Sequence, residues 1–388
     1  MQAVKYVVLV PDGASDEPIP ELDGRTPLEA AATPNLARLA ARGEVGRAAT
    51  IPAGLPPGSD VGNMSILGYD PAEYHTGRAP IEAAAMGIEL ADDEIAYRCN
   101  LVTVSPSGTM VDFSAGHIPS ELSRPIIEAV DATLGGEGVR FHPGVMYRHI
   151  MVAPRALGDA ECTPPHDLSD QPIVLPSGPA AARLVDLMEA SKGVVGTKAA
   201  ELGAAATQIW LWGQGSRPRL PRFVDRFGVT GELVTAVDLI RGLGVLTGIG
   251  VVEVPGATGY YDTNYEGKRD ACLASLEDHD FFLLHVEASD EAGHNGDLDA
   301  KVEALENWDR RIIGPLAAAL DDLGPYRILL MPDHPTPVRR KTHTSDAVPY
   351  LLFDSTADGP GGEYSERGTA AHPPVAGHTL MPRLVAPG

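Results

Sequence analysis

The stretch FFLLHVEASDEAGH, residues 281–294, decides the fold. Its first half, FFLLHVE, is an apolar run with the length of a strand, and its second half carries Asp290 and His294, four residues apart. In open α/β sheets, ligands bind beyond the carboxyl ends of the strands. An apolar strand that runs directly into an acid and a histidine therefore predicts an α/β fold with a ligand site at this edge.

Two other apolar segments end in the same way. Residues 4–10 (VKYVVLV) run into Asp12, and residues 326–332 (YRILLMP) run into Asp333 and His334. Three strands that each lead to acids or histidines are hard to obtain by chance, so we expect them to meet at one edge of the sheet. His343 follows His334 by nine residues and extends the set.

Each of these pieces also has an ordinary explanation. Asp12 before a glycine is typical of a turn, and Asp290 with His294 fits a helix-terminal carboxylate and a solvated histidine. Asp333, His334 and His343 fit a polar surface loop. Together they supply three carboxylates and three imidazoles, a mixed set that suits two divalent ions such as Mn, Mg, Co or Zn better than one structural zinc.

Ser59 lies in a turn rich in proline and glycine, GLPPGSDVG, residues 54–62. Two-metal centres support phosphoryl transfer, and a serine hydroxyl bound to such an ion becomes a nucleophile near neutral pH. The stretch does not match the G-x-S-x-G of serine hydrolases. A turn serine or a helix N-cap is the ordinary alternative, and a helix N-terminus there would also offer N–H groups to a phosphate.

Composition and charge limit the class of protein. The 388 residues carry a formal net charge of −23, which disfavours nucleic acid and anionic membranes as partners. The three cysteines are widely separated and form no C-x-x-C motif, which indicates neither a disulfide framework nor a thiolate metal site. The N-terminus is predicted to be a strand and not a signal peptide, and no apolar run approaches a membrane span, so we expect a cytoplasmic protein.

The order of segments predicts one domain split by another. Strand and helix patterns alternate at both ends of the chain, with TPNLARLAARG (33–43) a predicted helix capped by Thr33. Between them, IAYRCNLVTV and YRHIMVAP predict a more antiparallel region. We expect an α/β domain formed by residues 1–78 and 230–388, interrupted by an inserted α+β domain at residues 79–229.

The motifs resemble a known family over residues 4 to about 353. The segments LVPDG, PPGSDVGNMSILGYDP, MVDFSAGHI, ATGYYDTNYEGK, VEASDEAGHNGD and MPDHPTPV are similar to the archaeal-type, 2,3-bisphosphoglycerate-independent phosphoglycerate mutases of the alkaline phosphatase superfamily. The resemblance implies an alkaline-phosphatase-like, mainly parallel sheet flanked by helices. It further implies that the inserted domain is a lid that binds the substrate.

The resemblance also implies roles for individual residues. Ser59 would accept the phosphoryl group, and 3-phosphoglycerate and 2-phosphoglycerate would interconvert through phosphoserine without added 2,3-bisphosphoglycerate. Two divalent ions would be bound, with manganese as the first expectation, and one of them would be held by Asp12, Ser59, Asp333 and His334. The second would be held by Asp290, His294 and His343. Gly62, where the family pattern has alanine, is a departure expected to cost some helix stability without changing the chemistry.

A small anionic substrate in so acidic a protein requires fixed cations. Four candidates are His117, Arg148, Lys268 and Arg78, and for each a surface ion pair is an equal alternative. The sequence leaves other functions open: a metal-dependent phosphotransferase or phosphatase acting on another small phosphorylated metabolite, for example in a homoserine kinase-like role, or an inactive scaffold. It makes no prediction about the oligomeric state.

Overall fold

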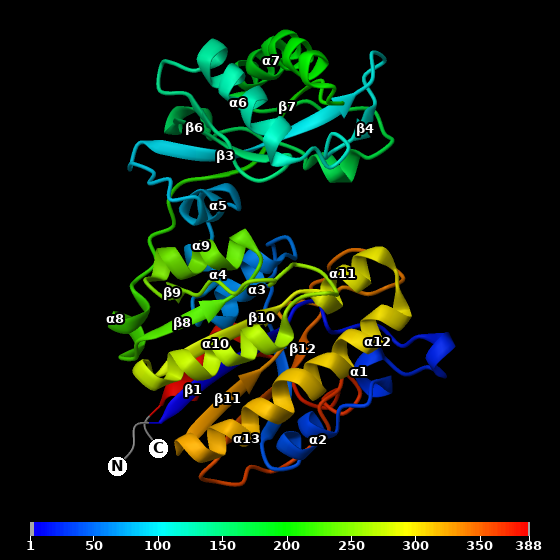
Figure 1. The fold of residues 1–388 in the computed structure, drawn as a ribbon, viewed down its shortest axis with the longest axis vertical. Helices are drawn as coiled ribbons and strands as arrows, with labels where there is room; N and C mark the ends of the chain where they lie inside the picture. The colour runs from blue at the N-terminus through cyan, green and yellow to red at the C-terminus, as the bar shows by residue number, and fades with distance from the viewer. Residues whose placement is uncertain (1–3, 387–388) are drawn as a thin grey trace. The chain divides into compact units, whose positions relative to one another are not determined.

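The computed structural model describes residues 4–386 of the chain (Figure 1). Its internal contacts divide the chain into two units, Met1–His75 with Leu220–Gly388, and Thr76–Arg219. The second unit thus begins three residues before the expected start at 79 and ends ten residues before the expected end at 229. Residues 220–229 contain helix α8 (Phe223–Phe227), and the Phe223 ring packs 4.6 Å from that of Phe281, in the core of the first unit.

The first unit is built on an eight-stranded sheet, in which five neighbouring strands are parallel. The order is β13 (Val375–Ala376), β2 (Glu44–Ala49), β12 (Val348–Asp354), β11 (Tyr326–Leu330), β1 (Lys5–Pro11), β10 (Phe281–Val286), β8 (Gly231–Val234) and β9 (Gly250–Val251). Strands β11 to β9 run parallel, whereas β12 is antiparallel to both of its neighbours. The predicted mainly parallel α/β sheet is confirmed.

Helices cover this sheet because its strands are apolar on both faces. Val7 and Leu9 of β1 join one large core, and the alternate residue Val8 is buried as well. That core takes in the helices α1 (Pro27–Ala30), α2 (Pro34–Ala40), α10 (Tyr265–Asp278), α12 (Leu298–Asn307), the π-helical η4 (Trp308–Ile313) and α13 (Gly314–Leu323), several of which lie across the sheet in Figure 1.

Besides α8, the first unit contains further helices. They are η1 (Pro20–Leu22), α3 (Ser59–Ile66), α4 (Pro71–Tyr74), α9 (Asp238–Thr247), α11 (Ala288–Asn295), η5 (Gly377–Thr379) and α14 (Leu380–Val385). Helix α9 packs against β8 and α3, and α14 packs against β11.

The second unit is an antiparallel sheet with helices, as predicted. Its strands are β3 (Glu94–Val104), β4 (Met110–Asp112), β5 (Arg140–His142), β6 (Arg148–Pro154) and β7 (Gln208–Gly215), with the long β3 paired to β4, β6 and β7. The helices are α5 (Ala79–Ala85), α6 (Ser120–Leu134), η2 (Arg155–Leu157), η3 (Pro165–Leu168) and α7 (Ala181–Leu202). Helices α6 and α7 share one apolar core with the sheet, and α5 packs on Ala96, Ile150 and Val152 in a separate cluster.

Within residues 4–386, no helix combines the length and the apolar character that crossing a bilayer requires.

Candidate metal centre

The seven residues predicted to bind metal ions or act as nucleophile all belong to the first unit. Strands β11, β1 and β10 are adjacent and parallel, so their carboxyl ends lie at one edge. Asp12 follows β1, Asp333 and His334 follow β11, and α11, which follows β10, carries Asp290 and His294. The expectation that three strand ends bring these groups together agrees with the observed geometry.

One cluster joins Asp12, Asp333 and His334 around Ser59. His334 Nε2 lies 3.3 Å from Asp333 Oδ2, 3.7 Å from Asp12 Oδ1 and 3.2 Å from Ser59 Oγ. Ser59 is the first residue of α3, and Gly58 takes the N-cap position, so the alternative that Ser59 caps the helix is wrong. The Ser59 hydroxyl instead faces the cluster.

A second cluster joins Asp290, His294 and His343. The Nε2 atoms of the two histidines lie 2.9 Å apart. Asp290 Oδ2 is 3.3 Å from His294 Nε2, and Asp290 Oδ1 is 3.5 Å from His343 Nε2. In each cluster the ligand atoms of the three residues lie within 4.8 Å of one another.

The hydrogen bonds of the histidines fix which nitrogen is free to bind an ion. Nδ1 of His294 lies 3.1 Å from the carbonyl oxygen of Lys341, and Nδ1 of His343 lies 3.3 Å from that of Pro57. A carbonyl oxygen only accepts, so both Nδ1 atoms donate, and once a ring has lost its second proton Nε2 carries the lone pair that faces Asp290 and the other ring. Facing lone pairs beside a carboxylate suit a bound cation.

The carboxylates also call for a cation. Asp12 Oδ1 is buried and has no hydrogen-bond partner among residues 4–386. Burial, together with the carboxylates of Asp333 and Asp290, raises the pKa of Asp12 well above its usual range. For His294, burial opposes protonation, but the Asp290 carboxylate raises the pKa to about 9. These residues therefore fit divalent ions, which would stabilise the charged carboxylates.

Neighbouring groups hold the cluster residues in place. Asn63, one turn after Ser59 in α3, donates from Nδ2 to Asp333 Oδ2 at 2.9 Å and to the Ser59 carbonyl at 3.0 Å. The hydroxyl of Thr336 donates to Asp290 Oδ1 and lies 3.2 Å from His334 Nδ1. Thr336 thus connects the two clusters. The sequence analysis did not identify Asn63 or Thr336, although both lie within motifs that it quoted.

Lys268, which was predicted to bind the substrate, lies in a buried ion pair. Its side chain is fully buried, and Nζ donates to Glu287 Oε2 at 2.7 Å and to the His285 carbonyl at 2.9 Å. Although burial opposes ionisation, Lys268 and His285 lower the pKa of Glu287 to about 2. This arrangement differs from the prediction that Lys268 binds the substrate, because protein encloses the ammonium group and Glu287 pairs with it.

The three other predicted cations all belong to the second unit. His117 is exposed, with its ring 6.1 Å from that of Tyr147, and the Arg148 guanidinium lies 6.0 Å from the same ring. His117 has a φ of 51° and Met146 a φ of 55°, in the left-handed region that side chains rarely adopt. Strain of this kind concentrates at functional sites.

Arg98 is a further cation of this unit that the sequence analysis missed. It is buried in β3, 2.9 Å from Glu82 Oε2 and 4.2 Å from the centre of the Trp212 ring, over which Arg78 also lies. Burial lowers the pKa of Arg98 to about 10, although Glu82 opposes this. A charged residue inside the otherwise apolar IAYRCNLVTV is the signal that could have identified it.

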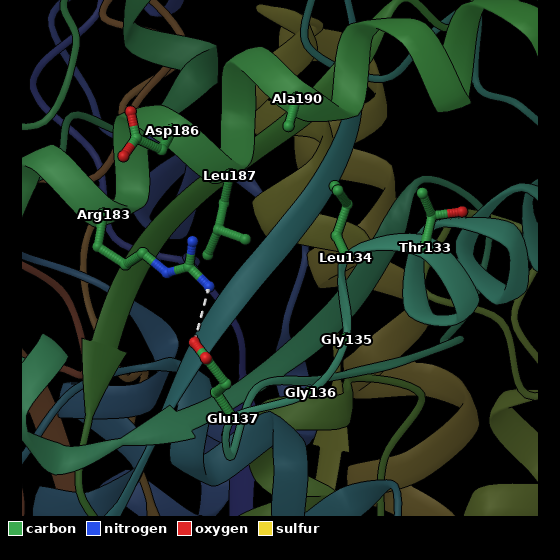
Figure 2. Close-up of a pocket in the computed structure, with 9 residues that line it drawn as sticks. All are labelled: Thr133, Leu134, Gly135, Gly136, Glu137, Arg183, Asp186, Leu187 and Ala190. Atoms are coloured by element: carbon green, nitrogen blue, oxygen red, sulfur yellow. Dashed lines mark ion pairs between the residues drawn. The ribbon is translucent and has the colours of Figure 1, made fainter.

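A hollow of about 360 Å³ lies elsewhere in the second unit, between the end of α6 and α7 (Figure 2). Its charged residues include Arg183 and Glu137, which are 3.8 Å apart and well exposed. None of the predicted site residues lines it. We therefore assign it no part in the site.

Comparison with known proteins gives consistent results. The family model for 2,3-bisphosphoglycerate-independent phosphoglycerate mutase matches residues 40–199. A Geobacter sulfurreducens protein named as a probable 2,3-bisphosphoglycerate-independent phosphoglycerate mutase is 50% identical over 361 residues, covering 90% of each chain. A Methanosarcina acetivorans protein with the same name, without "probable", is 48% identical over 371 residues, covering 92% of this chain and 93% of its own.

Solved structures agree over nearly the whole length. A protein from Pyrococcus horikoshii superposes with a TM-score of 0.80 at 27% identity, covering 99% of this chain and 97% of its own. A cofactor-independent phosphoglycerate mutase from Thermoplasma acidophilum superposes with a TM-score of 0.65 at 25% identity, covering 99% of both chains.

Proposed function

The chain belongs to the family of 2,3-bisphosphoglycerate-independent phosphoglycerate mutases, and we propose from this membership that it interconverts 3-phosphoglycerate and 2-phosphoglycerate through a phosphoserine at Ser59. The observation that carries the proposal is the Ser59 hydroxyl, 3.2 Å from His334 Nε2 and beside Asp12 and Asp333.

Two divalent ions would be held by the two clusters, with Mn²⁺ as the first candidate and Mg²⁺, Co²⁺ or Zn²⁺ as others. Asp12, Ser59, Asp333 and His334 would bind one, and Asp290, His294 and His343 the other. When bound, the ions would lower the pKa of the Ser59 hydroxyl and neutralise charge on the phosphoryl oxygens.

The protein groups around Ser59 orient the reaction. Ser59 is the first residue of α3, so a phosphate on its hydroxyl would lie near the N-terminus of a helix, where backbone N–H groups favour anions. Asn63 holds both the Ser59 backbone and Asp333, which keeps the nucleophile in register with the cluster. The phosphoryl group passes to Ser59, the glycerate reorients, and its other hydroxyl takes the group back.

Holding the glycerate falls to cations of the second unit. Arg148, His117 and Arg78 are candidates to bind its carboxylate and phosphate. The guanidinium groups of the two arginines match both anions in geometry. Water must be excluded while phosphoserine exists, because hydrolysis would turn the mutase into a phosphatase. The partner of the protein in this proposal is thus a small phosphorylated carboxylate.

Metal removal tests the proposal directly. Protein stripped by a chelator should lose turnover, and reloading with Mn²⁺ should restore interconversion of the two phosphoglycerates without added 2,3-bisphosphoglycerate. The measurement is a coupled assay, with circular dichroism to verify the fold. A folded protein that turns over neither isomer with any of the four ions would disprove the mutase function. Free phosphate without isomer would favour a phosphatase acting on a related metabolite.

Replacement of the nucleophile is the second test. Ser59→Ala should lower turnover by at least about 10³-fold, and should prevent trapping of a phosphoenzyme, while the protein still binds metal. Ser65→Ala, a change at a buried serine of the same helix, is the matched control and should remain active. Activity retained in Ser59→Ala would remove Ser59 from the mechanism.

A further inference from the structure

Two buried side chains, Glu287 and His285, connect the buried Lys268 to the buried Asp12. Lys268 Nζ lies 2.7 Å from Glu287 Oε2, and Glu287 Oε1 lies 3.1 Å from Nδ1 of His285. On the other side of that ring, Nε2 lies 3.1 Å from Asp12 Oδ2, an electrostatic contact that lacks the alignment of a hydrogen bond. The exposed fraction of these four side chains is 3% or less. The His285 ring therefore bridges Glu287 and Asp12 out of contact with solvent.

His285 differs from the histidines of the two clusters. Their Nδ1 atoms face neutral oxygens, and their Nε2 atoms are left to accept. The His285 ring instead has a carboxylate oxygen 3.1 Å from each nitrogen, Glu287 Oε1 at Nδ1 and Asp12 Oδ2 at Nε2. His285 belongs to neither group of ligand atoms found within 4.8 Å of one another among the described residues.

The two oxygens of the Asp12 carboxylate have different surroundings. Oδ2 faces His285, whereas Oδ1, 3.7 Å from His334 Nε2, is buried without a hydrogen-bond partner in the described part of the chain. A carboxylate at the end of a strand is otherwise free to rotate about its last bond. With Oδ2 beside His285, Oδ1 is the oxygen turned toward His334.

Glu287 is itself held rigidly. Its Oε1 accepts from the Ala236 amide at 2.8 Å and from the Thr235 hydroxyl at 3.1 Å, in addition to the Lys268 ion pair on Oε2. These contacts fix the ring through Nδ1, so the position of Nε2 is determined by strand β10 and its surroundings.

We propose that His285, fixed by Glu287 and Lys268, is a positioning residue that orients Asp12 to bind a divalent ion through Oδ1. The proposal rests on the proposed function in one respect, namely that Asp12 is an ion ligand. Groups that orient metal ligands in this way typically change metal affinity by about 10–100-fold when they are removed.

Calorimetric titration of chelator-stripped protein with Mn²⁺ tests the proposal without any substrate. His285→Leu keeps the volume of the side chain and leaves the Glu287–Lys268 pair intact, and His285→Gln restores an N–H near the position of Nε2. His279→Gln, a change at a partly exposed histidine, is the matched control. Circular dichroism verifies the fold of each variant.

The wild-type protein and His279→Gln should bind two ions. In His285→Leu, one of the two sites should weaken by about 10–100-fold, and His285→Gln should recover part of the loss. Two unchanged sites in His285→Leu would overturn the proposal. Equal weakening of both sites, with no recovery in His285→Gln, would also overturn it, because it would indicate a general structural role. Wild-type protein that binds Mn²⁺ but shows no mutase activity would reject the proposed function alone.

Discussion

Gly62 allows helix α3 to approach the loop that carries Asp333. A Cβ atom at this position would lie 2.4 Å from the Asp333 carbonyl oxygen, a backbone atom that cannot turn away. The sequence analysis expected a small loss of helix stability and no effect on chemistry at this glycine. The close contact gives a different reason for a glycine at this position, because the helix that begins at Ser59 lies directly against the backbone of a cluster residue.

Gly62→Ala should therefore destabilise the protein. Overpacking costs about 1–3 kcal/mol, which exceeds the roughly 1 kcal/mol that alanine adds to a helix over glycine. Urea unfolding measures the change. Gly196→Ala, at a helical position of α7 with open space around it, is the control and should stabilise. If Gly62→Ala stabilises the protein as much as Gly196→Ala, the backbone at Asp333 moves at no cost in free energy. The close contact would then not explain the glycine.

At the scale of elements, buried charges join segments that are distant in sequence. Lys301 of α12 is fully buried, and Nζ donates to Asp16 Oδ2 at 2.9 Å, to the Ser15 carbonyl at 3.2 Å and to the Thr336 carbonyl at 2.8 Å. The two loops that Lys301 joins follow β1 and β11. The first carries Asp12, and the second carries Asp333 and His334. Helix α12 thus holds the edge of the sheet where the candidate metal centre lies.

Lys301→Met should destabilise the protein by about 3–5 kcal/mol, because it leaves the Asp16 carboxylate buried without its cation. The urea midpoint of purified protein measures the loss, and the additional change Asp16→Asn should recover part of it. Lys192→Met removes an exposed ion pair with Glu189 and should have an effect below about 1 kcal/mol. A loss no larger than in that control would contradict the role assigned to Lys301.

At the scale of the whole molecule, the two units have separate cores. The second unit buries its own apolar cluster between its sheet and helices α6 and α7. Its ends lie together, since the Thr76 hydroxyl donates to the Ser216 carbonyl at 2.5 Å. All seven predicted ion ligands, Ser59 among them, belong to the first unit.

A fragment of residues 76–219 should therefore fold by itself, because its core is complete and its size is that of an independent domain. Near-ultraviolet circular dichroism of the buried Trp210 and a cooperative thermal transition measure folding. Titration with Mn²⁺ should show none of the tight binding expected of the full chain. A disordered spectrum would contradict the separation of the cores.

Some features of the molecule were determined locally and could be predicted. Apolar runs that stop at Asp12, Asp290 and Asp333 indicated parallel strands whose ends meet, since strand periodicity and the chemistry that follows each strand are written in neighbouring residues. The fold class and the family membership predicted from these motifs are confirmed. That the seven residues bind ions stays a prediction.

Other features depend on residues that meet only after folding. Helix α2 begins where TPNLARL predicted it, yet Thr33 makes no side-chain cap, and the Asp309 carboxylate accepts from the amides of Asn35 and Leu36 instead. The burial of Lys268 against Glu287 and the Nδ1 contacts of His294 and His343 are likewise set by distant partners. Local sequence fixes periodicity and residue chemistry, whereas burial and pairing are decided by the tertiary structure because the partners lie far apart along the chain.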